Sequence, residues 1–446
     1  MSGIAGIADT NKQTDVKRIL NTIAHRGGTT QIIEAGATTL GVTSSKYQSG
    51  AIKQLRRDHV AQDESGFGHF ATAQGQGDEF TLKRDAVGVT PLYYGWTKDG
   101  LLCFASEVKG LLEFTRHPHE LPPGHSFDGQ RVVAYKRLTR RLESRDTPEN
   151  IAAELRCRLE KVMQKYADRG MLGSWLSGGL DSSVLAALAG QYFHPLHTFT
   201  AGLPGAPDVT YAQMVADHIQ SQHHVRQVTI EEMLTVLPEV IYHLESFDAW
   251  LVRSSIMNYL VAQMAADYVP AVFSGEGGDE LFAGYEYLKT LDPVDLPDEL
   301  IDITGRLHNT ALQRVDRCAS AHGTVAHVAF LDPDILDFSF RIPIQYKLRD
   351  GVEKWILREA VADVLPAPIV NRPKAKFWEG AGVEDILAQQ AEQIISDADF
   401  AGERRLPNGW RLNTKEELLY YRIFREHFGE FEELNWMGRT KGSPVN

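Results

Sequence analysis

Hydrophobic and polar positions follow two different patterns along the chain. In the first 140 residues, short segments rich in β-forming residues and glycine are separated by Gly, Asp and Lys turn signals; examples are GIAGIAD, TLGVTSS, FGHFATAQ, TPLYYGW and LLCFASE. A later segment, LPPGHSFDGQRVVAYK, has the pattern of a turn and two closing strands. Short strands joined by turns are typical of antiparallel sheets. The pattern therefore predicts a mostly antiparallel, layered α+β domain over residues 1–145.

The pattern changes after a polar stretch at residues 141–150. Residues 151–170 have apolar side chains at helical spacing and end at a glycine, which predicts a helix. Strand-like segments then alternate with helical ones, first MLGSWLSGG and LDSSVLAALAGQY, then HPLHTFTAGL, TYAQMVADHIQSQ and HHVRQVTI. This alternation predicts a parallel sheet with crossover helices. We therefore expect an α/β protein whose second domain, residues 150–446, is a doubly wound parallel sheet with a helical part from about Asp292 onward. Within that part, residues 302–355 show only helical packing.

Composition narrows the classes of function. The chain has 446 residues, a net charge of −13 and 43% hydrophobic residues, so it can bury a core but lacks a general basic surface for nucleic acid. Its three cysteines lie far apart without zinc spacing, which favours idle thiols. No apolar run reaches the roughly 18 residues of a membrane span, and the first residues do not resemble a signal peptide. We expect a cytoplasmic protein without nucleic-acid or membrane partners.

A glycine turn between a predicted strand and helix carries the strongest chemical signal. Glycines allow a tight turn, and the following helix start presents backbone N–H groups to an anion. Asp181 would repel a phosphate unless it holds Mg²⁺, which bridges carboxylate and phosphate oxygens. Neither the GxxxxGK[ST] nor the GxGxxG pattern fits, because no lysine follows and the glycines are adjacent. The turn consists of Ser177, Gly178, Gly179, Leu180, Asp181, Ser182 and Ser183.

This turn is the pyrophosphate-loop signature of ATP pyrophosphatases, and further motifs make the resemblance specific. The segments LHTFTAGLPGAPD (196–208), EVIYHLESFD (239–248), FSGEGGDELFAGYEY (273–287), EKWILREA (353–360) and RPKAKFWEGAG (372–382) resemble the asparagine synthetase family in the same order. The start MSGIAGI, HRG at 25–27 and FASEVKGLL at 104–112 resemble that family's glutaminase domain, which is Ntn-hydrolase-like. The resemblance implies ATP-dependent adenylation of a carboxylate, attack by ammonia or an amine, and release of AMP and pyrophosphate.

The resemblance also implies roles for individual residues. Asp181 and Asp279 match Mg²⁺ ligands, and Lys354 and Lys374 match lysines aimed at phosphates, with Lys374 stabilising the transition state. Glu276 matches the residue that contacts the substrate amino group or assists proton removal from the amine. The residues implied for ATP are Leu176, the turn at residues 177–183, Thr200, Ala201, Gly202, Leu203, Ser274 and Gly275. The residues implied for the acceptor are Asp208, Trp250, Arg253 and Asp279.

Several positions depart from the family pattern. Trp250 and Leu251 stand where the family usually has two threonines, and Val325 and His327 replace a glutamate and an arginine. We expect these changes to lie near the acceptor acid. Aspartate, converted to asparagine, is the leading acceptor. The alternative is another carboxylic acid, amidated or closed into an intramolecular amide as in β-lactam synthetases, although those enzymes have a tyrosine where this chain has Glu276.

The first domain lacks the parts of a working glutaminase. The family's nucleophile is a cysteine at position 2, and this chain has Ser2, a poorer nucleophile near neutral pH. The family's segments for the glutamine carboxylate and the oxyanion have no match near residues 40–45 and 62–70. We therefore predict ammonia, not glutamine, as nitrogen source. A homodimer, a separate protein that supplies ammonia, and the identity of the acceptor stay open. A catalytically silent binding subunit is disfavoured by the intact Asp181, Glu276 and Lys374.

Overall fold

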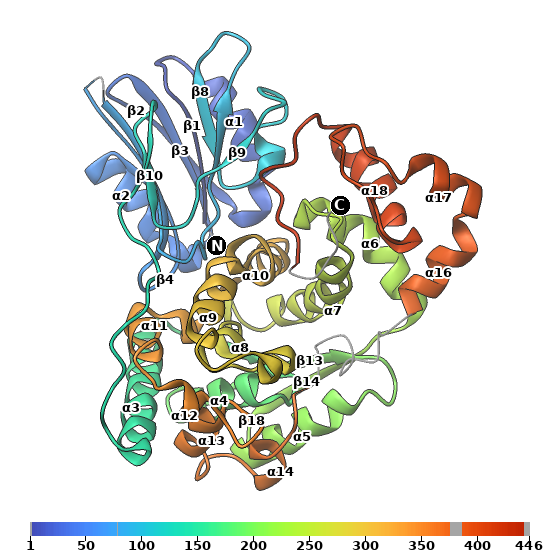
Figure 1. The fold of residues 1–446 in the computed structure, drawn as a ribbon. Coiled ribbons are helices and arrows are strands. Elements are labelled where there is room, and N and C mark those ends of the chain that lie inside the picture. The colour runs from blue at the N-terminus through green and yellow to red at the C-terminus, as the bar shows by residue number, and fades with distance from the viewer. Residues whose placement is uncertain (1, 78, 375–385, 441–446) are drawn as a thin grey trace.

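Two antiparallel sheets form the N-terminal part of the protein. The computed structural model describes residues 2–77, 79–374 and 386–440. One sheet has the strand order β2-β3-β1-β8-β7-β9 and the other the order β11-β10-β6-β5-β4 (Figure 1). The bounds in the first sheet are β1 (Ser2–Ile7), β2 (Thr29–Ala35), β3 (Thr38–Ser44), β7 (Tyr93–Trp96), β8 (Leu102–Ala105) and β9 (His119–Glu120). Those in the second are β4 (Val60–Gly66), β5 (His69–Gln76), β6 (Glu79–Arg84), β10 (His125–Phe127) and β11 (Val132–Ala134).

Successive side chains of β1 pack on opposite faces of its sheet. Ile4 packs into the apolar layer between the two sheets, with Phe104 of β8. Ala5 and Ile7 belong to the large core that also holds Ile19 of α1 (Gln13–Thr22). This period of two is the strand pattern that a layered, two-sided sheet requires. A second helix, α2 (Gly50–Asp58), lies beside β3 and β4. The predicted antiparallel layered architecture is confirmed.

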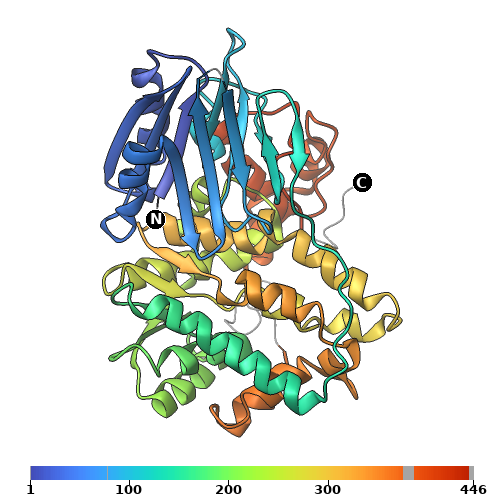
Figure 2. The same cartoon turned by 90° about the vertical axis from the view of Figure 1, so that its left-hand side faces the viewer.

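An extended stretch joins the antiparallel part to the rest of the chain. After β11 it runs along the side of the molecule to α3 (Pro148–Ala167) (Figure 2). Thr147 caps α3 by accepting a hydrogen bond from the backbone N–H of Asn150, and Pro148 occupies the first turn. Both are ordinary helix-start devices, since they use groups that lack helical partners. The polar stretch at residues 141–150 therefore contains the end of this connection, and its last three residues begin α3.

A five-stranded parallel sheet forms the centre of the C-terminal part, with the order β14-β13-β12-β15-β16. In Figure 1, α7 and α10 lie between this sheet and the N-terminal sheets, while α4 and α5 lie on its other side. Helices on both faces make the sheet doubly wound, as predicted. The bounds are β12 (Gly173–Trp175), α4 (Leu180–Ala189), β13 (His197–Gly202), α5 (Pro207–Ile219), β14 (Gln222–Gln227), α6 (Ile230–Leu244), α7 (Ala249–Ala266), β15 (Ala271–Phe273), α8 (Gly278–Leu281) and β16 (Val325–His327).

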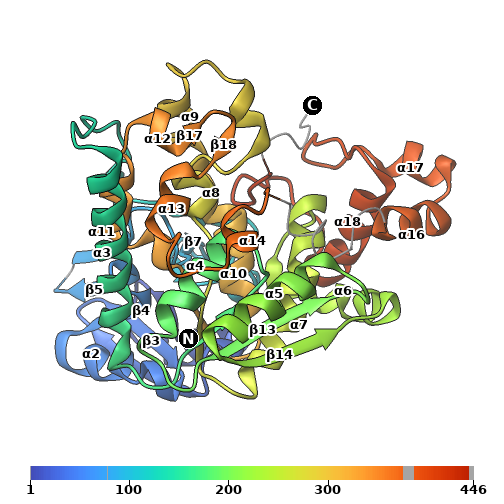
Figure 3. The same ribbon diagram turned by 90° about the horizontal axis from the view of Figure 1, so that it is seen from below.

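The remainder of the chain is mainly helical. Helices α16 to α18 gather at one side, away from α3 (Figure 3). The segment after α18 returns to the N-terminal part, where the Trp436 ring meets Tyr93 edge-on at 6.5 Å. No helix in the described part of the chain is both long and apolar enough to cross a membrane. The bounds are α9 (Leu296–Gly305), α10 (Ala311–Ser320), α11 (Pro333–Ser339), α12 (Ile344–Lys347), α13 (Trp355–Ala360), α14 (Ala367–Val370), α16 (Ile386–Ile394), α17 (Asp397–Glu403) and α18 (Lys415–Phe428).

The prediction of helical packing alone over residues 302–355 is wrong. This stretch contains β16, an edge strand of the parallel sheet, and a hairpin of β17 (Leu348–Arg349) and β18 (Val352–Glu353). All three residues of β16 are buried, and a turn at Gly323 precedes them. A strand of three buried residues shows no alternation of apolar and polar positions, so periodicity could not identify it.

Candidate nucleotide and acceptor site

The first glycine turn lies between β12 and the start of α4. Gly178 has φ +70°, and a Cβ there would stand 2.5 Å from the backbone nitrogen of Ala212. The turn is closed internally, because Ser177 N–H donates to Ser182 Oγ at 3.1 Å and that hydroxyl donates to Gly179 O at 3.1 Å. No side chain caps the helix start at Gly179. The first-turn N–H groups of α4 therefore keep the capacity to bind an anion.

Two aspartates and two lysines meet above this turn. Lys354 Nζ lies 2.6 Å from Asp279 Oδ1 and also pairs with Asp181, while Lys374 Nζ lies 2.7 Å from Asp279 Oδ2. Burial raises the pKa of Asp279, but the Lys354 and Lys374 charges lower it more strongly, to well below its ordinary value. Asp279 therefore carries a negative charge that the two lysines neutralise, whereas burial raises the pKa of Asp181 against the opposing charge of Lys354. These four residues were predicted as ligands of the metal and the phosphates, and the structure brings them together.

The cleft around these ion pairs is small, with a volume of about 80 Å³. Three charged residues that line it were not predicted from the sequence: Glu353, Arg358 and Arg372. Glu353 and Arg372 stand in motifs recognised for their lysines, and Arg358 is one helical turn beyond Lys354 on α13, so a wider interpretation of the same motifs could have found them. The lining consists of Ser177, Gly179, Leu180, Asp181, Ser182, Asp208, Glu353, Lys354, Arg358, Arg372, Pro373 and Lys374.

The second glycine turn, residues 274–279 after β15, contacts the first. A Cβ on Gly275 would stand 2.9 Å from the backbone nitrogen of Ser182, and one on Gly278 would stand 2.5 Å from Asp181 Oδ1. Glycine is therefore required here by close approach. Ser274 at the strand end is buried, and its N–H donates to the His327 carbonyl at 2.9 Å. Because parallel strands end at one edge of the sheet, both turns face the same side.

Lys354 is held by its backbone as well as by its ion pairs. It lies at the start of α13 with φ +55°, a conformation that non-glycine residues seldom adopt. Its N–H donates to Phe282 O at 3.1 Å, which anchors it to the end of α8. Next to it, Gly284 leaves the room that the Asp279 carboxylate and the Lys354 side chain occupy. A strained residue at a charged cleft indicates a position selected for function rather than for stability.

The carboxylate pair fits a divalent cation. Asp181 Oδ1 is buried and has no hydrogen-bond partner among the described residues. An unpartnered carboxylate oxygen in the interior is costly, and a Mg²⁺ ion, which prefers oxygen ligands, would satisfy it. Asp279 lies close enough to share Lys354 with Asp181, so the two carboxylates converge. The predicted Mg²⁺ ligands thus form a site of suitable chemistry.

Two further predicted residues make contacts beside the first glycine turn and in the lining of the cleft. Thr200 near the end of β13 donates to the Leu176 carbonyl, with Ala201, Gly202 and Leu203 following it. Asp208 pairs with Arg372 at 2.5 Å, and burial raises the pKa of Asp208 while Arg372 lowers it. The Arg372 guanidinium also stacks over Tyr211 at 4.0 Å.

Two residues predicted for the acceptor, Trp250 and Arg253, lie on α7 and outside the lining of this cleft. Arg253 donates twice to Glu416 of α18. Leu251 is buried in the core. Of the residues predicted for the acceptor, the structure therefore places Asp208 and Asp279 in or beside the cleft and leaves Trp250 and Arg253 outside its lining. Part of the last recognised motif, from residue 375, lies outside the described residues.

Neither Val325 nor His327 lines the cleft, although both were expected near the acceptor acid. Val325 is a buried residue of β16, paired with Ala271 of β15. The His327 ring packs on Tyr166 at a centroid distance of 4.4 Å, and its Nε2 lies 3.0 Å from the Tyr47 hydroxyl of the N-terminal part. The His327 ring therefore points toward the N-terminal part and away from the cleft, although the His327 carbonyl accepts a hydrogen bond from Ser274 N–H.

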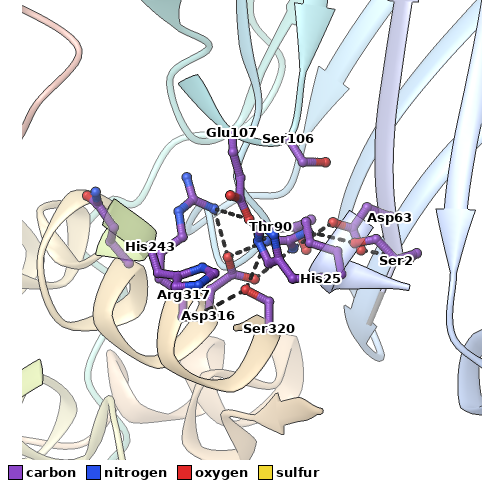
Figure 4. A network of polar contacts seen from close by, with 12 residues as sticks. Ser2, His25, Asp63, Thr90, Ser106, Glu107, His243, Asp316, Arg317 and Ser320 are labelled. Atoms are coloured by element: carbon purple, nitrogen blue, oxygen red, sulfur yellow. Dashed lines mark hydrogen bonds and ion pairs between the residues drawn. The ribbon is translucent and has the colours of Figure 1, made fainter. Parts of the chain in front are cut away.

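Ser2 at the start of β1 is buried in a network of charges (Figure 4). Its hydroxyl donates to Asp63 Oδ1 at 2.8 Å, and its carbonyl accepts from Arg26 Nε at 2.8 Å. The Arg26 guanidinium, fully buried, also binds Asp63, Glu107 and Asp316, each within 3.0 Å. Asp316 lies on α10, so this network joins the antiparallel part to the C-terminal part.

Comparison with known proteins identifies the family for most of the chain. The asparagine synthase family matches residues 155–294 and 292–442, and a glutamine amidotransferase domain matches residues 50–113. Asparagine synthetase B [glutamine-hydrolyzing] of Escherichia coli (strain K12) is 34% identical over 403 residues, which are 85% of this chain and 73% of that protein. Asparagine synthetases [glutamine-hydrolyzing] 2 of Arabidopsis thaliana and Oryza sativa subsp. japonica are each 33% identical over 78% of this chain, which spans 65% and 63% of their lengths. These matches show that the chain, with its glycine turn and aspartate–lysine cluster, belongs to the asparagine synthase family of ATP-dependent carbon–nitrogen ligases.

Proposed function

We propose that the protein activates aspartate with ATP and transfers ammonia to it, giving asparagine, AMP and pyrophosphate. The cluster of Asp181, Asp279, Lys354 and Lys374 beside the glycine turn carries this proposal. It offers cations, a metal-binding carboxylate pair and backbone N–H donors within one cleft. Those groups match the needs of a reaction whose leaving group is pyrophosphate.

The residues of the cleft have separable tasks in this proposal. The N–H groups at the start of α4 and the hydroxyls of Ser177 and Ser182 bind the pyrophosphate moiety. Lys374, which is more exposed than Lys354, stabilises the charge that builds as the bond to the α-phosphate breaks. Asp279 holds both lysines in position. Mg²⁺ at Asp181 and Asp279 would shield the phosphate charge when bound.

We propose that Ser2 does not hydrolyse glutamine and that residues 1–145 serve as a scaffold for the synthetase part, residues 150–446. A serine nucleophile needs a base that takes its proton. The only described carboxylate that accepts from Ser2 Oγ is Asp63, whose other oxygen is bound by Arg26. Burial raises the pKa of Asp63 more than Arg26 lowers it, so the support for ammonia as the nitrogen source comes from the serine hydroxyl itself, a poorer nucleophile than the cysteine thiolate of the family.

A second acceptor class is favoured by one observation. Arg253, predicted to lie near the acceptor, is engaged by Glu416 through two hydrogen bonds. A dicarboxylate such as aspartate must displace Glu416 to use this arginine, whereas a smaller or less charged acid need not. The alternative function is therefore amidation, or intramolecular amide closure, of another carboxylic acid.

Pyrophosphate release by the purified protein tests the proposal. Reactions contain MgATP, ammonium and one acid, with aspartate compared against glutamate and succinate, and products are identified by mass spectrometry. Pyrophosphate and asparagine in equal amounts with aspartate support the proposal. Pyrophosphate with a different acid supports the alternative, and absence of pyrophosphate with every acid contradicts both.

A further inference from the structure

Helix α10 lies between the buried network around Ser2 and the second glycine turn. At one end of this connection, Arg314 of α10 donates to Glu276, the turn residue assigned to the attacking amine. The Arg314 side chain is 12% exposed and that of Glu276 is 24% exposed, so the contact is largely shielded from water. A charge-assisted hydrogen bond in such surroundings restricts the orientation of the carboxylate more than a surface pair does.

Arg314 remains charged in this position. Burial lowers its pKa, but the Glu276 charge raises it more strongly, so the net effect is a raised pKa. The guanidinium is planar and always protonated near neutral pH, which makes it suitable for fixing one carboxylate geometry. Lysine at the same place would keep the charge but not the planar donors.

At the other end of the connection, α10 is bound to the N-terminal part. Asp316 accepts from both terminal nitrogens of Arg26, at 2.8 and 2.9 Å, and Ser320, one turn later, accepts from the same guanidinium at 3.4 Å (Figure 4). Arg26 is fully buried and belongs to the short helix before β2. The two contacts fix one stripe of the helix, since residues four apart lie on one face.

Two neighbouring residues on the same face of α10 are held by the segment at the end of α6. Gln313 donates to the Leu244 carbonyl at 2.6 Å, and Arg317 donates to Glu245 at 3.0 Å. Residues 313, 316, 317 and 320 are spaced i, i+3, i+4 and i+7 and therefore lie along one face of the helix. Because this face is anchored at four points, to Arg26, Leu244 and Glu245, the helix is fixed about its axis, and Arg314 is presented to Glu276 in one orientation.

We propose that Arg314 is a positioning residue for Glu276, and that Arg26 and Asp316 set its place by fixing α10. This inference rests on the proposed function, because it takes Glu276 as the group that meets the incoming ammonia. It gives the N-terminal part a role that does not require glutamine hydrolysis. The antiparallel sheets hold α10, and α10 carries the arginine that orients Glu276 for amide formation. The phosphate-binding groups come from other elements, namely the α4 turn and the residues around Lys354 and Lys374. Loss of Arg314 should therefore affect amide formation more than ATP cleavage.

The ratio of asparagine formed to pyrophosphate released tests this inference. The reactions contain MgATP, aspartate and ammonium chloride, and both products are measured in the same tube for R314Q, R314K and D316N. Arg306→Gln is the matched control, because Arg306 makes an exposed pair with Asp302 on the preceding helix end. We expect R314Q to lower the ratio about tenfold or more, in line with the roughly 10²-fold cost of a 1 Å misplacement, while pyrophosphate release changes less than about threefold.

The remaining variants separate positioning from general damage. R314K should recover part of the ratio, D316N should lower it in the same direction as R314Q, and R306Q should leave it unchanged. A wild-type ratio in R314Q overturns the inference, as does a parallel fall of both products together with a loss of thermal stability in R314Q and R314K. A wild-type ratio in D316N overturns the role of the N-terminal part. Failure of the wild-type protein to form either product contradicts the proposed function itself.

Discussion

Substitution of Gly284 by alanine is the most direct steric test of the cleft. A Cβ at this position would stand 2.1 Å from Asp279 Oδ1 and 2.2 Å from Lys354 Cε. Ordinary contact begins at 3.4 Å, so the carboxylate or the lysine must move by about 1.3 Å. A misplacement of about 1 Å at a reacting centre costs on the order of 10²-fold in rate. Since φ of Gly284 lies outside the left-handed region, the effect comes from crowding and not from backbone strain.

The assay is pyrophosphate release with MgATP, aspartate and ammonium, alongside the affinity for MgATP measured by calorimetry. We expect G284A to reduce the rate about 10²-fold and to weaken MgATP binding. Gly305 at the end of α9 provides a matched control, because a Cβ there meets nothing within 4 Å. G305A should retain the wild-type rate. A rate for G284A within twofold of wild type would refute the role assigned to the Asp279–Lys354 pair.

Three further predictions concern the N-terminal part. Ser2→Ala removes the hydroxyl that donates to buried Asp63, so it should lower the free energy of unfolding by about 1–3 kcal/mol in chemical denaturation. Ammonia-dependent activity should stay unchanged. A variant as stable as the wild type would contradict the buried hydrogen bond. Arg26→Met leaves buried carboxylates unpaired and should cost about 3–5 kcal/mol in the same experiment, a loss below about 1 kcal/mol being inconsistent with the network. Burial raises the pKa of Glu120, but His308 and then Arg84 lower it more strongly, from 4.5 to about 2. Its stabilisation is present above pH 4.5 and is lost as the pH falls toward 2, so the stability difference between wild type and E120Q should shrink by about 3 kcal/mol over that interval; a constant difference contradicts the assignment.

Sequence patterns predicted those parts of the fold and of the site that depend on residues close together in the chain. The first glycine turn was predicted because adjacent glycines between a strand and a helix permit few other structures, and the second lies in a segment that resembles the family. The parallel sheet followed from alternating strands and helices, and Lys354 and Lys374 came from the family motifs in which they stand. These features depend on residues close together in the chain.

The features that the sequence did not predict depend on contacts between distant segments. Arg314 is one of two arginines on the amphipathic helix α10, and nothing beside it in the sequence indicates that Glu276 is its partner. Arg26 and Asp316 are 290 positions apart, so their pairing follows only from how the two parts pack. For the same reason, His327 was expected near the acceptor, whereas the pleat of β16 directs its ring toward Tyr47.

The nitrogen source tests the central account most directly. The protein is incubated with MgATP, aspartate, unlabelled glutamine and ¹⁵N-labelled ammonium, and the amide of the product is examined by mass spectrometry. Ammonia-dependent ligation with a silent Ser2 predicts asparagine labelled at the amide nitrogen and no glutamate. Unlabelled asparagine formed together with glutamate would contradict the account, because the N-terminal part would then hydrolyse glutamine.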